Sequence, residues 1–309
     1  MKKHFSVFLC ILLMFSFIGC AEKEGTDTTD GVKIVDALGN TAYINKESKI
    51  AVCYGSFAQC LQLSGISPVA VTKDAIDEHK LEFNSDTKII GTVKQINLEE
   101  LLAVNPDYVI MSADLSAQLK LENSLKNAGL NYGYFRVDTF EDYKSFMSTL
   151  CAVSGREDLF QKNVSDTEKG INNILSKIPA ESDKTVLLLR AFSSGVKAKR
   201  QDNLAGQILK ELGLKNVADE FPSLMEDLSS EQIIHHNPDY IFILTMGSEQ
   251  SAINFLKNNI ENTSAFKNLK AVKTGNYVLL PKDLFHYKPN NRWDEAYEYL
   301  AKIIYPESF

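Results

Sequence analysis

The stretch NLEELLAVNPDYVIM at residues 97–111 recurs in altered form as SSEQIIHHNPDYIFI at residues 229–243. The two stretches align without a gap, and each joins a helix-like half to an apolar run through the tetrapeptide Asn-Pro-Asp-Tyr. Pro106 and Pro238 cannot continue a helix, and each disfavours the α conformation for the asparagine before it. The apolar runs that follow are typical of strands buried on both faces. The repeat therefore predicts the same helix-to-strand junction in two similar halves.

Both copies also begin with a helix-start signal. Asn97 with Glu100 three residues later matches a capping box, and Ser229 with Gln232 matches it in the second copy. We therefore expect a capped helix before each junction.

Alternating strand and helix patterns surround the two copies, which predicts α/β lobes with mainly parallel sheets. The patterns are KIAVCYGSFAQCLQLSG (49–65), KIIG (88–91), TVLLLRAFSSG (185–195), NLAGQILKELG (203–213) and the segment 261–281.

A long helix is expected between the halves, at DLFQKNVSDTEKGINNILSKIP (158–179), where apolar residues keep helical spacing up to Pro179. Such a helix spans roughly 30 Å. The predicted organisation is an N-terminal lobe over 32–157, the helix over 158–179 and a C-terminal lobe over 180–309. A single large α/β domain with a chance repeat is the alternative.

The N-terminus carries an export signal. Two lysines precede an apolar run in MKKHFSVFLCILLMFSFIGC, which predicts a signal peptide over 1–19. Its end, Phe17-Ile18-Gly19-Cys20, resembles a bacterial lipobox, in which cleavage leaves Cys20 diacylated. The polar segment 20–31 then reads as a flexible tether. We expect an extracytoplasmic protein that contacts the membrane through its lipid anchor alone, on the outer face of the bacterial cytoplasmic membrane.

Composition disfavours several other classes. The formal net charge is −7 and no basic tract occurs, which argues against nucleic-acid binding. Cys53, Cys60 and Cys151 have no disulfide-framework spacing and are expected as buried free thiols. The five histidines are few for a bare Zn²⁺ or Mn²⁺ site, and His235-His236 is expected to be solvated or packed. An exported two-lobed enzyme remains an alternative, although no nucleophile elbow, zinc helix or phosphate loop is present.

Taken together and in order, these features resemble the substrate-binding lipoproteins of ABC importers, in the class for siderophores, haem and cobalamin. The features are the lipobox, the two repeated stretches, the linking helix, RAFSSGVKAKRQDNLAGQILKELGLKNVAD (190–219) and VLLPKDLFHYKPNNRWDEAYEYLAKIIYP (278–306). The resemblance implies two Rossmann-like lobes joined by one rigid helix, with the ligand between them. It also implies a monomer with no catalytic residues and no cofactor, whose partner is a permease dimer with its ATPase subunits. Glu99 and Glu231 match the glutamates that dock on the permease.

The ligand cleft is expected at the carboxyl ends of the strands. Cations gather in these loops although the chain is acidic, which favours an anionic ligand held by arginine forks. A ferric siderophore is the main hypothesis, and haem, cobalamin or an oxyanion remain open. We rank Arg190 and Arg292 above Lys199. The predicted ligand-binding residues are Tyr54, Met111, Arg136, Arg190, Lys197, Arg200, Met246, His286, Tyr287 and Arg292.

Two further predictions concern an axial pair for haem and the packing of the single tryptophan. If the ligand is haem, His286 with Met111 or Met246 is the candidate axial pair. Trp293 begins an apolar helical stripe and is expected to pack in the core.

Overall fold

The computed structural model describes residues 31–180, 182–225 and 230–309, without the side chains of residues 223, 230 and 231. The predicted signal peptide, the lipidation residue Cys20, nearly all of the tether and the predicted cap Ser229 lie outside the described residues. Within the described residues, no helix is long and apolar enough to cross a membrane.

The N-terminal lobe is built on a parallel five-stranded sheet in the order β5-β4-β3-β8-β9. A β1–β2 hairpin and a short β6–β7 pair are added to it. The strands are β1 (Val32–Val35), β2 (Thr41–Ile44), β3 (Ile50–Val52), β4 (Ala70–Val71), β5 (Lys88–Ile89), β6 (Gly91–Thr92), β7 (Gln95–Ile96), β8 (Tyr108–Ser112) and β9 (Tyr132–Phe135). The helices are α1 (Gly55–Leu63), α2 (Asp74–Asp77), α3 (Leu98–Ala103), α4 (Ser116–Leu119), α5 (Glu122–Asn127) and α6 (Phe140–Ser154).

The C-terminal lobe has a mixed sheet in the order β11-β10-β13-β14, with β12 also paired to β10. The strands are β10 (Thr185–Phe192), β11 (Gly195–Lys199), β12 (Lys215–Asn216), β13 (Tyr240–Thr245) and β14 (Tyr277–Leu279). The helices are α9 (Leu204–Glu211), α10 (Val217–Glu220), α11 (Ser230–His236), α12 (Glu249–Leu256), α13 (Ser264–Lys267), α14 (Lys270–Lys273), α15 (Lys282–Phe285) and α16 (Trp293–Ile304). Short 3₁₀ turns cover Pro222–Met225, Asn290–Arg292 and Pro306–Ser308, and a π-helical segment covers Lys257–Glu261.

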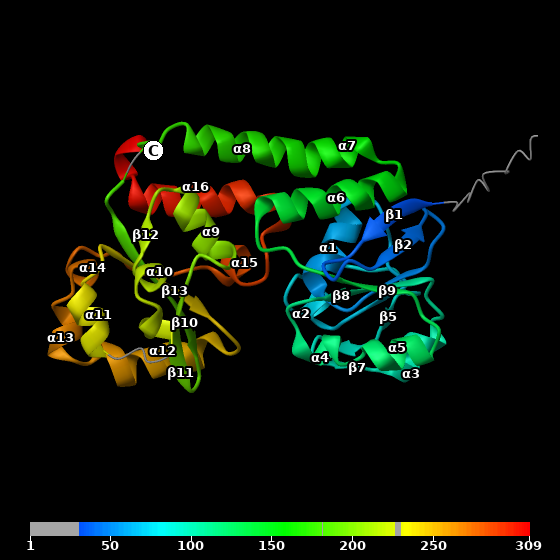
Figure 1. The fold of residues 1–309 in the computed structure, drawn as a ribbon, viewed down its shortest axis with the longest axis horizontal. Coiled ribbons are helices and arrows are strands. Elements are labelled where there is room, and N and C mark those ends of the chain that lie inside the picture. Colours follow the sequence, from blue (N-terminus) through cyan, green and yellow to red (C-terminus); the bar gives the residue numbers. More distant parts are fainter. Residues whose placement is uncertain (1–30, 181, 226–229) are drawn as a thin grey trace, which may run out of the picture.

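A layer of helices joins the two lobes (Figure 1). The expected linking helix is present as α7 (Glu157–Phe160), a π-helical segment (Gln161–Ser165) and α8 (Asp166–Leu175). It ends at Leu175, before Pro179. Its middle was expected to be α-helical but is π-helical. The carbonyl oxygen of Asn163 accepts hydrogen bonds from Tyr143 and Thr167 at this place, and polar insertions of this kind accompany π-segments. The prediction of an α/β fold with two lobes and parallel sheets is confirmed.

The two repeated junctions have the same geometry. Asn105 and Asn237 both adopt the left-handed conformation, with φ of 47° and 42°. The strands that follow the two junctions also pair with their neighbours at equivalent positions. Tyr108 pairs with Ile50 in the first lobe, and Tyr240 pairs with Val186 in the second. The prolines thus end each helix as predicted, and the asparagines tolerate the positive φ that the turn requires.

The first cap differs in detail from its prediction. Asn97 accepts hydrogen bonds from the backbone N–H groups of Glu99 and Glu100 at 3.1 and 3.2 Å, so it is the N-cap of α3. Its own N–H, however, donates to the carbonyl of Ile90 at 2.9 Å. Glu100 therefore does not complete a capping box, because the backbone group it would cap is already satisfied.

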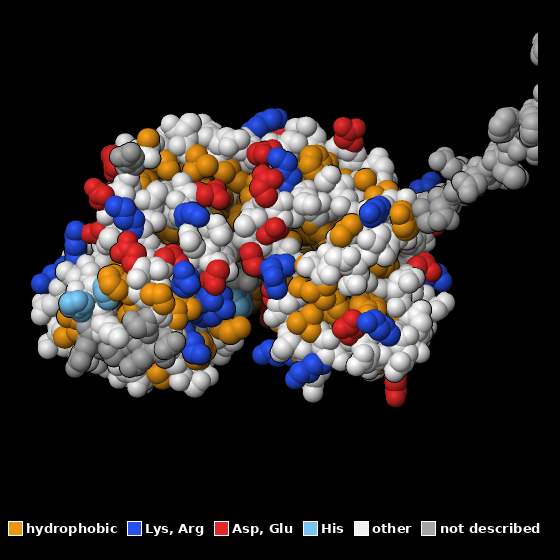
Figure 2. All heavy atoms as spheres, in the orientation of Figure 1, with side chains coloured by type: hydrophobic (Ala, Val, Ile, Leu, Met, Phe, Trp, Pro, Cys, Tyr) orange, Lys and Arg blue, Asp and Glu red, His pale blue; other side chains and the backbone are white. Residues whose placement is uncertain are grey.

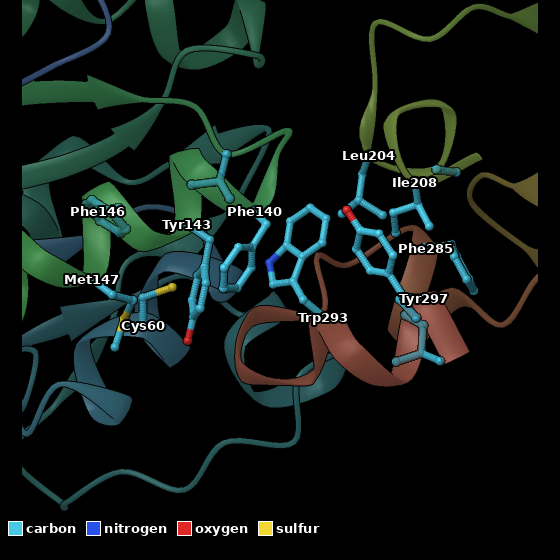
Figure 3. Packing of buried hydrophobic residues seen from close by; sticks show 14 of the residues in the cluster. Cys60, Phe140, Tyr143, Phe146, Met147, Leu204, Ile208, Phe285, Trp293 and Tyr297 are labelled. Atoms are coloured by element: carbon cyan, nitrogen blue, oxygen red, sulfur yellow. The ribbon is translucent and has the colours of Figure 1, made fainter. Parts of the chain in front are cut away.

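One hydrophobic cluster runs through both lobes and the helical layer. Trp293 is fully buried in it, as expected, and lies between Phe140 of α6 and Leu204 of α9 (Figure 3). The Phe140 and Trp293 rings meet edge to face, with centroids 6.1 Å apart. The lobes are therefore joined by shared packing as well as by the linking helix.

Candidate ligand-binding site

A hollow separates the two lobes on the side opposite the helical layer (Figure 2). Lys and Arg side chains gather on both sides of this hollow in the view shown (Figure 2). The loops after β3, β8 and β9 of one lobe and after β13 and β14 of the other are at the carboxyl ends of the parallel strands. Open α/β sheets bind ligands at this edge, and the hollow is the candidate ligand cleft.

Arg190 is positioned by the alternation of strand β10. Val186 and Leu188 face the shared core, whereas Leu187 and Leu189 face the second core cluster. Arg190 lies on the same face of β10 as Val186 and Leu188, just beyond the shared core. Its guanidinium is largely buried there, and its Nε has no hydrogen-bond partner. Burial lowers the pKa of Arg190, partly opposed by nearby acidic groups. An unsatisfied buried cation of this kind is a site for an anionic partner.

Lys199 lies on the same face as Arg190. The expected loop over 190–200 is in fact a hairpin, because the two residues Ser193 and Ser194 connect β10 to antiparallel β11. Arg190 pairs with Lys197 and Leu188 with Lys199, so both lysines project from the face that carries Arg190. Lys199 is half-buried and its pKa is lowered by burial and then by Arg190, whereas Lys197 is exposed. Lys199 is thus less buried than Arg190, which was ranked above it, and more buried than Arg292, which was also ranked above it.

The two predicted arginines Arg200 and Arg292 form ion pairs within the C-terminal lobe. Arg292 contacts Asp283 at 2.9 Å and Glu295 at 2.7 Å, and these carboxylates raise its pKa despite partial burial. Arg200 contacts Asp219 at 3.0 Å. The expectation that Arg292 ranks with Arg190 is corrected, because its guanidinium already has two anionic partners and that of Arg190 has none in the described residues.

The two predicted methionines differ in position. Met111 is 0% exposed and packs in the third core cluster with Leu125 and Tyr134. Met246 follows β13 and is 44% exposed. The prediction of Met111 as a ligand contact is wrong, because the side chain falls on the core face of β8. Met246 remains available to a ligand.

His286 and Tyr287 lie close to His79, a residue that the sequence does not indicate as part of the site. The rings of His286 and Tyr287 lie 5.0 Å apart, and the ring of His79 from the other lobe lies 5.8 Å from Tyr287. Burial lowers the pKa of His79 to about 4, and burial with nearby Lys282 and Arg190 lowers that of His286 to about 4. Both imidazoles are therefore neutral at neutral pH. His79 follows a helix of four residues, and no pattern in the sequence marks it as a cleft residue.

Tyr54 forms the N-cap position of α1 and is half-buried. Burial, followed by the charge of Asp74, raises its pKa. Asp74 is itself buried and accepts a hydrogen bond from the N–H of Gly55 at 2.6 Å. A side chain at Gly55 would collide with His79 and Asp74, so this glycine permits the close approach of α2 to α1. Tyr54 is thus a neutral phenol just beyond the carboxyl end of β3.

Arg136 is exposed and contacts Asp114 at 2.6 Å, with Asp138 at 4.0 Å. Asp138 in turn contacts Lys288 from the C-terminal lobe at 2.7 Å. Arg136 therefore has anionic partners within its own lobe, as Arg292 does.

A second contact joins the lobes beside this ion pair. The Asn290 amide donates to the carbonyl of Ser56 at 3.0 Å and to Gln59 at 2.6 Å, and its oxygen accepts from the Ser56 hydroxyl at 3.3 Å. Asn290 is 1% exposed, so its hydrogen bonds to α1 are sheltered from water.

The remaining predictions concern the two docking glutamates, the cysteines and the histidine pair. Glu99 is exposed in the first turn of α3. Glu231 is in α11, but its side chain lies outside the described part. Cys53, Cys60 and Cys151 are buried free thiols, as expected. His235 and His236 are adjacent in α11, and no group of three or more metal-binding side chains is found among the described residues.

The fold and this arrangement define a two-lobed protein that binds a ligand between its lobes. The family model described as "Periplasmic binding protein" matches residues 50–284. The chain therefore belongs to the periplasmic binding protein family, whose members bind substrates for transporters, and it is a binding protein rather than an enzyme. The recognition made from the sequence is confirmed.

Individual relatives are distant but cover nearly the whole chain. The Fe(3+)-citrate-binding protein YfmC of Bacillus subtilis is 25% identical over 280 residues, covering 87% of this chain and 86% of YfmC. The triscatecholate siderophore-binding protein FeuA of Bacillus subtilis, solved with ferri-bacillibactin, has a TM-score of 0.69 at 20% identity, covering 88% and 97%. IsdE of S. aureus, solved with heme, has a TM-score of 0.69 at 17% identity, covering 84% and 99%. The two structures establish likeness of fold.

Proposed function

We propose that this protein captures a ferric chelate, most simply a ferric siderophore, in the interlobe cleft and delivers it to an ABC permease. The observation that carries the proposal is the pair Arg190 and Lys199. Arg190 is largely buried and Lys199 is half-buried, and neither has a carboxylate within ion-pair distance in the described residues. Ferric siderophores present carboxylate or catecholate oxygens, which suit such donors.

The aromatic and neutral groups supply the rest of the site. Tyr54, Tyr287 and the two neutral imidazoles of His79 and His286 offer flat surfaces and hydrogen-bonding atoms without adding charge. Met246 adds an exposed apolar contact. The relatives' names, which include ferric citrate and ferric siderophores, support a chelate as the ligand class.

The test is calorimetric titration of the mature protein with ferric citrate, a ferric tris-catecholate, a ferric tris-hydroxamate, haemin and cobalamin. We expect binding of at least one ferric chelate in the micromolar range or tighter, and weaker binding of the iron-free chelator. Binding of haemin or cobalamin with no binding of any ferric chelate would overturn the proposal. Tryptophan fluorescence is a poor substitute, because Trp293 is fully buried away from ligand.

Haem is the alternative ligand, and one observation keeps it in the test. His286 is neutral at neutral pH and Met246 is exposed, so an imidazole and a thioether are both available. Met111 is removed from the axial candidates by its burial.

Delivery and anchoring are further parts of the proposal. We infer that Glu99 and Glu231 dock on the two permease subunits, since they hold equivalent positions in α3 and α11. Cys20 is proposed as the diacylated residue that holds the protein at the outer face of the membrane. Loss of palmitate labelling in Cys20→Ala cells would support the anchor, and unchanged labelling would exclude it.

A further inference from the structure

Asp138 and Lys288 form an ion pair across the two lobes. The Lys288 Nζ lies 2.7 Å from Asp138 Oδ1, and the two side chains are 12% and 28% exposed. Among the ion pairs of the described residues, it is the one that joins the N-terminal lobe to the C-terminal lobe. Low exposure protects it from the screening that weakens surface pairs.

The backbone holds Lys288 in place. Lys288 and Asn290 have positive φ values of 66° and 51°, which are uncommon outside glycine. Pro289 lies between them, and Asn290 is fastened to α1 by its amide hydrogen bonds. A lysine in this conformation, followed by an anchored residue, is positioned by tertiary contacts rather than by local preference.

Asp138 also acts on Arg190 and Lys199, neither of which has an ion-pair partner among the described residues. Its charge raises the pKa of Arg190 and of Lys199, against the lowering caused by burial. Asp202 acts in the same direction from within the C-terminal lobe. Asp138 is thus a negative charge that the N-terminal lobe presents to the cations of the opposite lobe, where an anionic ligand would also bind.

We propose that Asp138 is an internal counter-ion for Arg190, Lys199 and Lys288, and that it sets the ligand charge the cleft prefers. The proposal rests on the proposed function, since the ligand is taken to be a ferric chelate. A chelate with several negative charges must compete with Asp138 for these cations and is repelled by it. A neutral chelate meets neither effect.

The experiment compares Asp138→Asn with wild type by calorimetry, using two ferric complexes that differ in charge. One is a tris-catecholate complex with three negative charges, and the other is a neutral tris-hydroxamate complex. We expect Asp138→Asn to tighten binding of the anionic complex by about tenfold and that of the neutral complex by less than about twofold. Asp138→Glu, which keeps the charge, should bind both as wild type does.

Glu168→Gln is the matched control. It removes one carboxylate from the 2.6 Å ion pair with Lys144, which joins α6 to α8 in the helical layer. This variant should leave both affinities within about twofold, because the charge lies outside the cleft. A tenfold gain for the control would show a general charge effect and overturn the proposal.

Other outcomes are also decisive. Equal changes for the two complexes, or no change for either, would overturn the counter-ion role. If wild type binds only the neutral complex, binding of the anionic complex by Asp138→Asn supports the role, and its continued absence overturns it. If only the anionic complex binds measurably, a steeper salt dependence in Asp138→Asn supports the role and an unchanged slope overturns it.

If wild type binds neither complex, ligand-free protein decides the role of Asp138, and the proposed function fails only if ferric citrate does not bind either. A double-mutant cycle of Asp138→Asn and Lys288→Gln is then measured by urea unfolding. Coupling of about threefold or more in the unfolding equilibrium constant supports the counter-ion, and additive effects overturn it.

Discussion

Asp239 accepts a hydrogen bond from the backbone N–H of Thr185 at 2.7 Å and thereby fixes the first residue of β10. Asp107 accepts the equivalent bond from Lys49 at 2.7 Å, just before β3. The aspartate of each repeated tetrapeptide therefore ties its own strand to the neighbouring one. The tetrapeptide is preserved in both lobes because each residue has a structural task at the junction.

Asp239→Asn should destabilise the protein more than Asp107→Asn. Asp239 also accepts from the Thr185 hydroxyl and pairs with Lys270, whereas Asp107 is exposed. We expect a loss of about 1–3 kcal/mol for Asp239→Asn and about 0.5–1.5 kcal/mol for Asp107→Asn. Urea unfolding at pH 7 measures both, and equal losses would contradict the difference in their contacts.

The contribution of Asp239 depends on pH in a defined direction. Partial burial acts to raise its pKa, but hydrogen bonds from Lys270 and Thr185 hold the pKa below its ordinary value of 3.8. Its stabilisation is therefore complete above the unfolded pKa and is lost as pH falls through the folded pKa. The stability difference between wild type and Asp239→Asn should shrink below about pH 4. A constant difference down to pH 2 would be inconsistent with the lowered pKa.

Arg190→Gln should weaken binding of an anionic ferric chelate by about tenfold to a hundredfold, because a hydrogen-bonded charge contact is lost. Arg292→Gln is the control and should change affinity by less than about threefold, since Asp283 and Glu295 already hold that guanidinium. Calorimetric titration measures both. Similar losses for the two variants would show that the ion pairs of Arg292 open on binding.

His79 and His286 should make the protein less stable as the pH falls. Their folded pKa values of about 4 are below the ordinary value of 6.5. The unfolded chain therefore takes up protons first, so stability is full above about pH 6.5 and declines towards pH 4. The double variant His79→Gln with His286→Gln should have a flatter profile in urea unfolding at pH 7.5, 6, 5 and 4.5. An unchanged slope would show that these imidazoles are protonated in the folded protein.

Trp293→Ala should destabilise the whole molecule by about 3–5 kcal/mol, because it leaves a large cavity where the lobes share a core. Both lobes should still unfold in one transition, since Phe140 and Leu204 of the same cluster belong to different lobes. Thermal unfolding followed by calorimetry distinguishes this from two separate transitions. Trp293→Phe keeps most of the volume and should lose less.

Glu99→Ala combined with Glu231→Ala should lower uptake of the labelled chelate into cells and leave affinity in solution unchanged. Rim charges of this kind set encounter rate and register more than ligand binding. Glu100→Ala, which removes the neighbouring exposed carboxylate of α3, is the control and should leave uptake near wild type. Unchanged uptake in the double variant would remove the docking assignment.

The candidate site was predicted in part, and the misses have a common cause. The sequence identifies Arg190 as a cation that ends an apolar strand, because a charge after a buried run is visible in the pattern. It does not show whether a cation finds a carboxylate from a distant element. Arg292 and Arg200 pair with such carboxylates, and Lys199 pairs with none in the described part of the chain, because of how the hairpin and the helices pack.

Local chemistry determined the framework of this protein from the sequence by itself. Proline and asparagine at the repeated junctions end helices and start buried strands, and these rules act over a few residues. The tertiary structure alone decided what faces the cleft. Alternation along β8 puts Met111 beside Val109 in the third core cluster. The meeting of the two lobes brings His79 to Tyr287 and Asp138 to Lys288. Those contacts join residues far apart in the chain, so burial and charge pairing there follow from packing and not from local pattern.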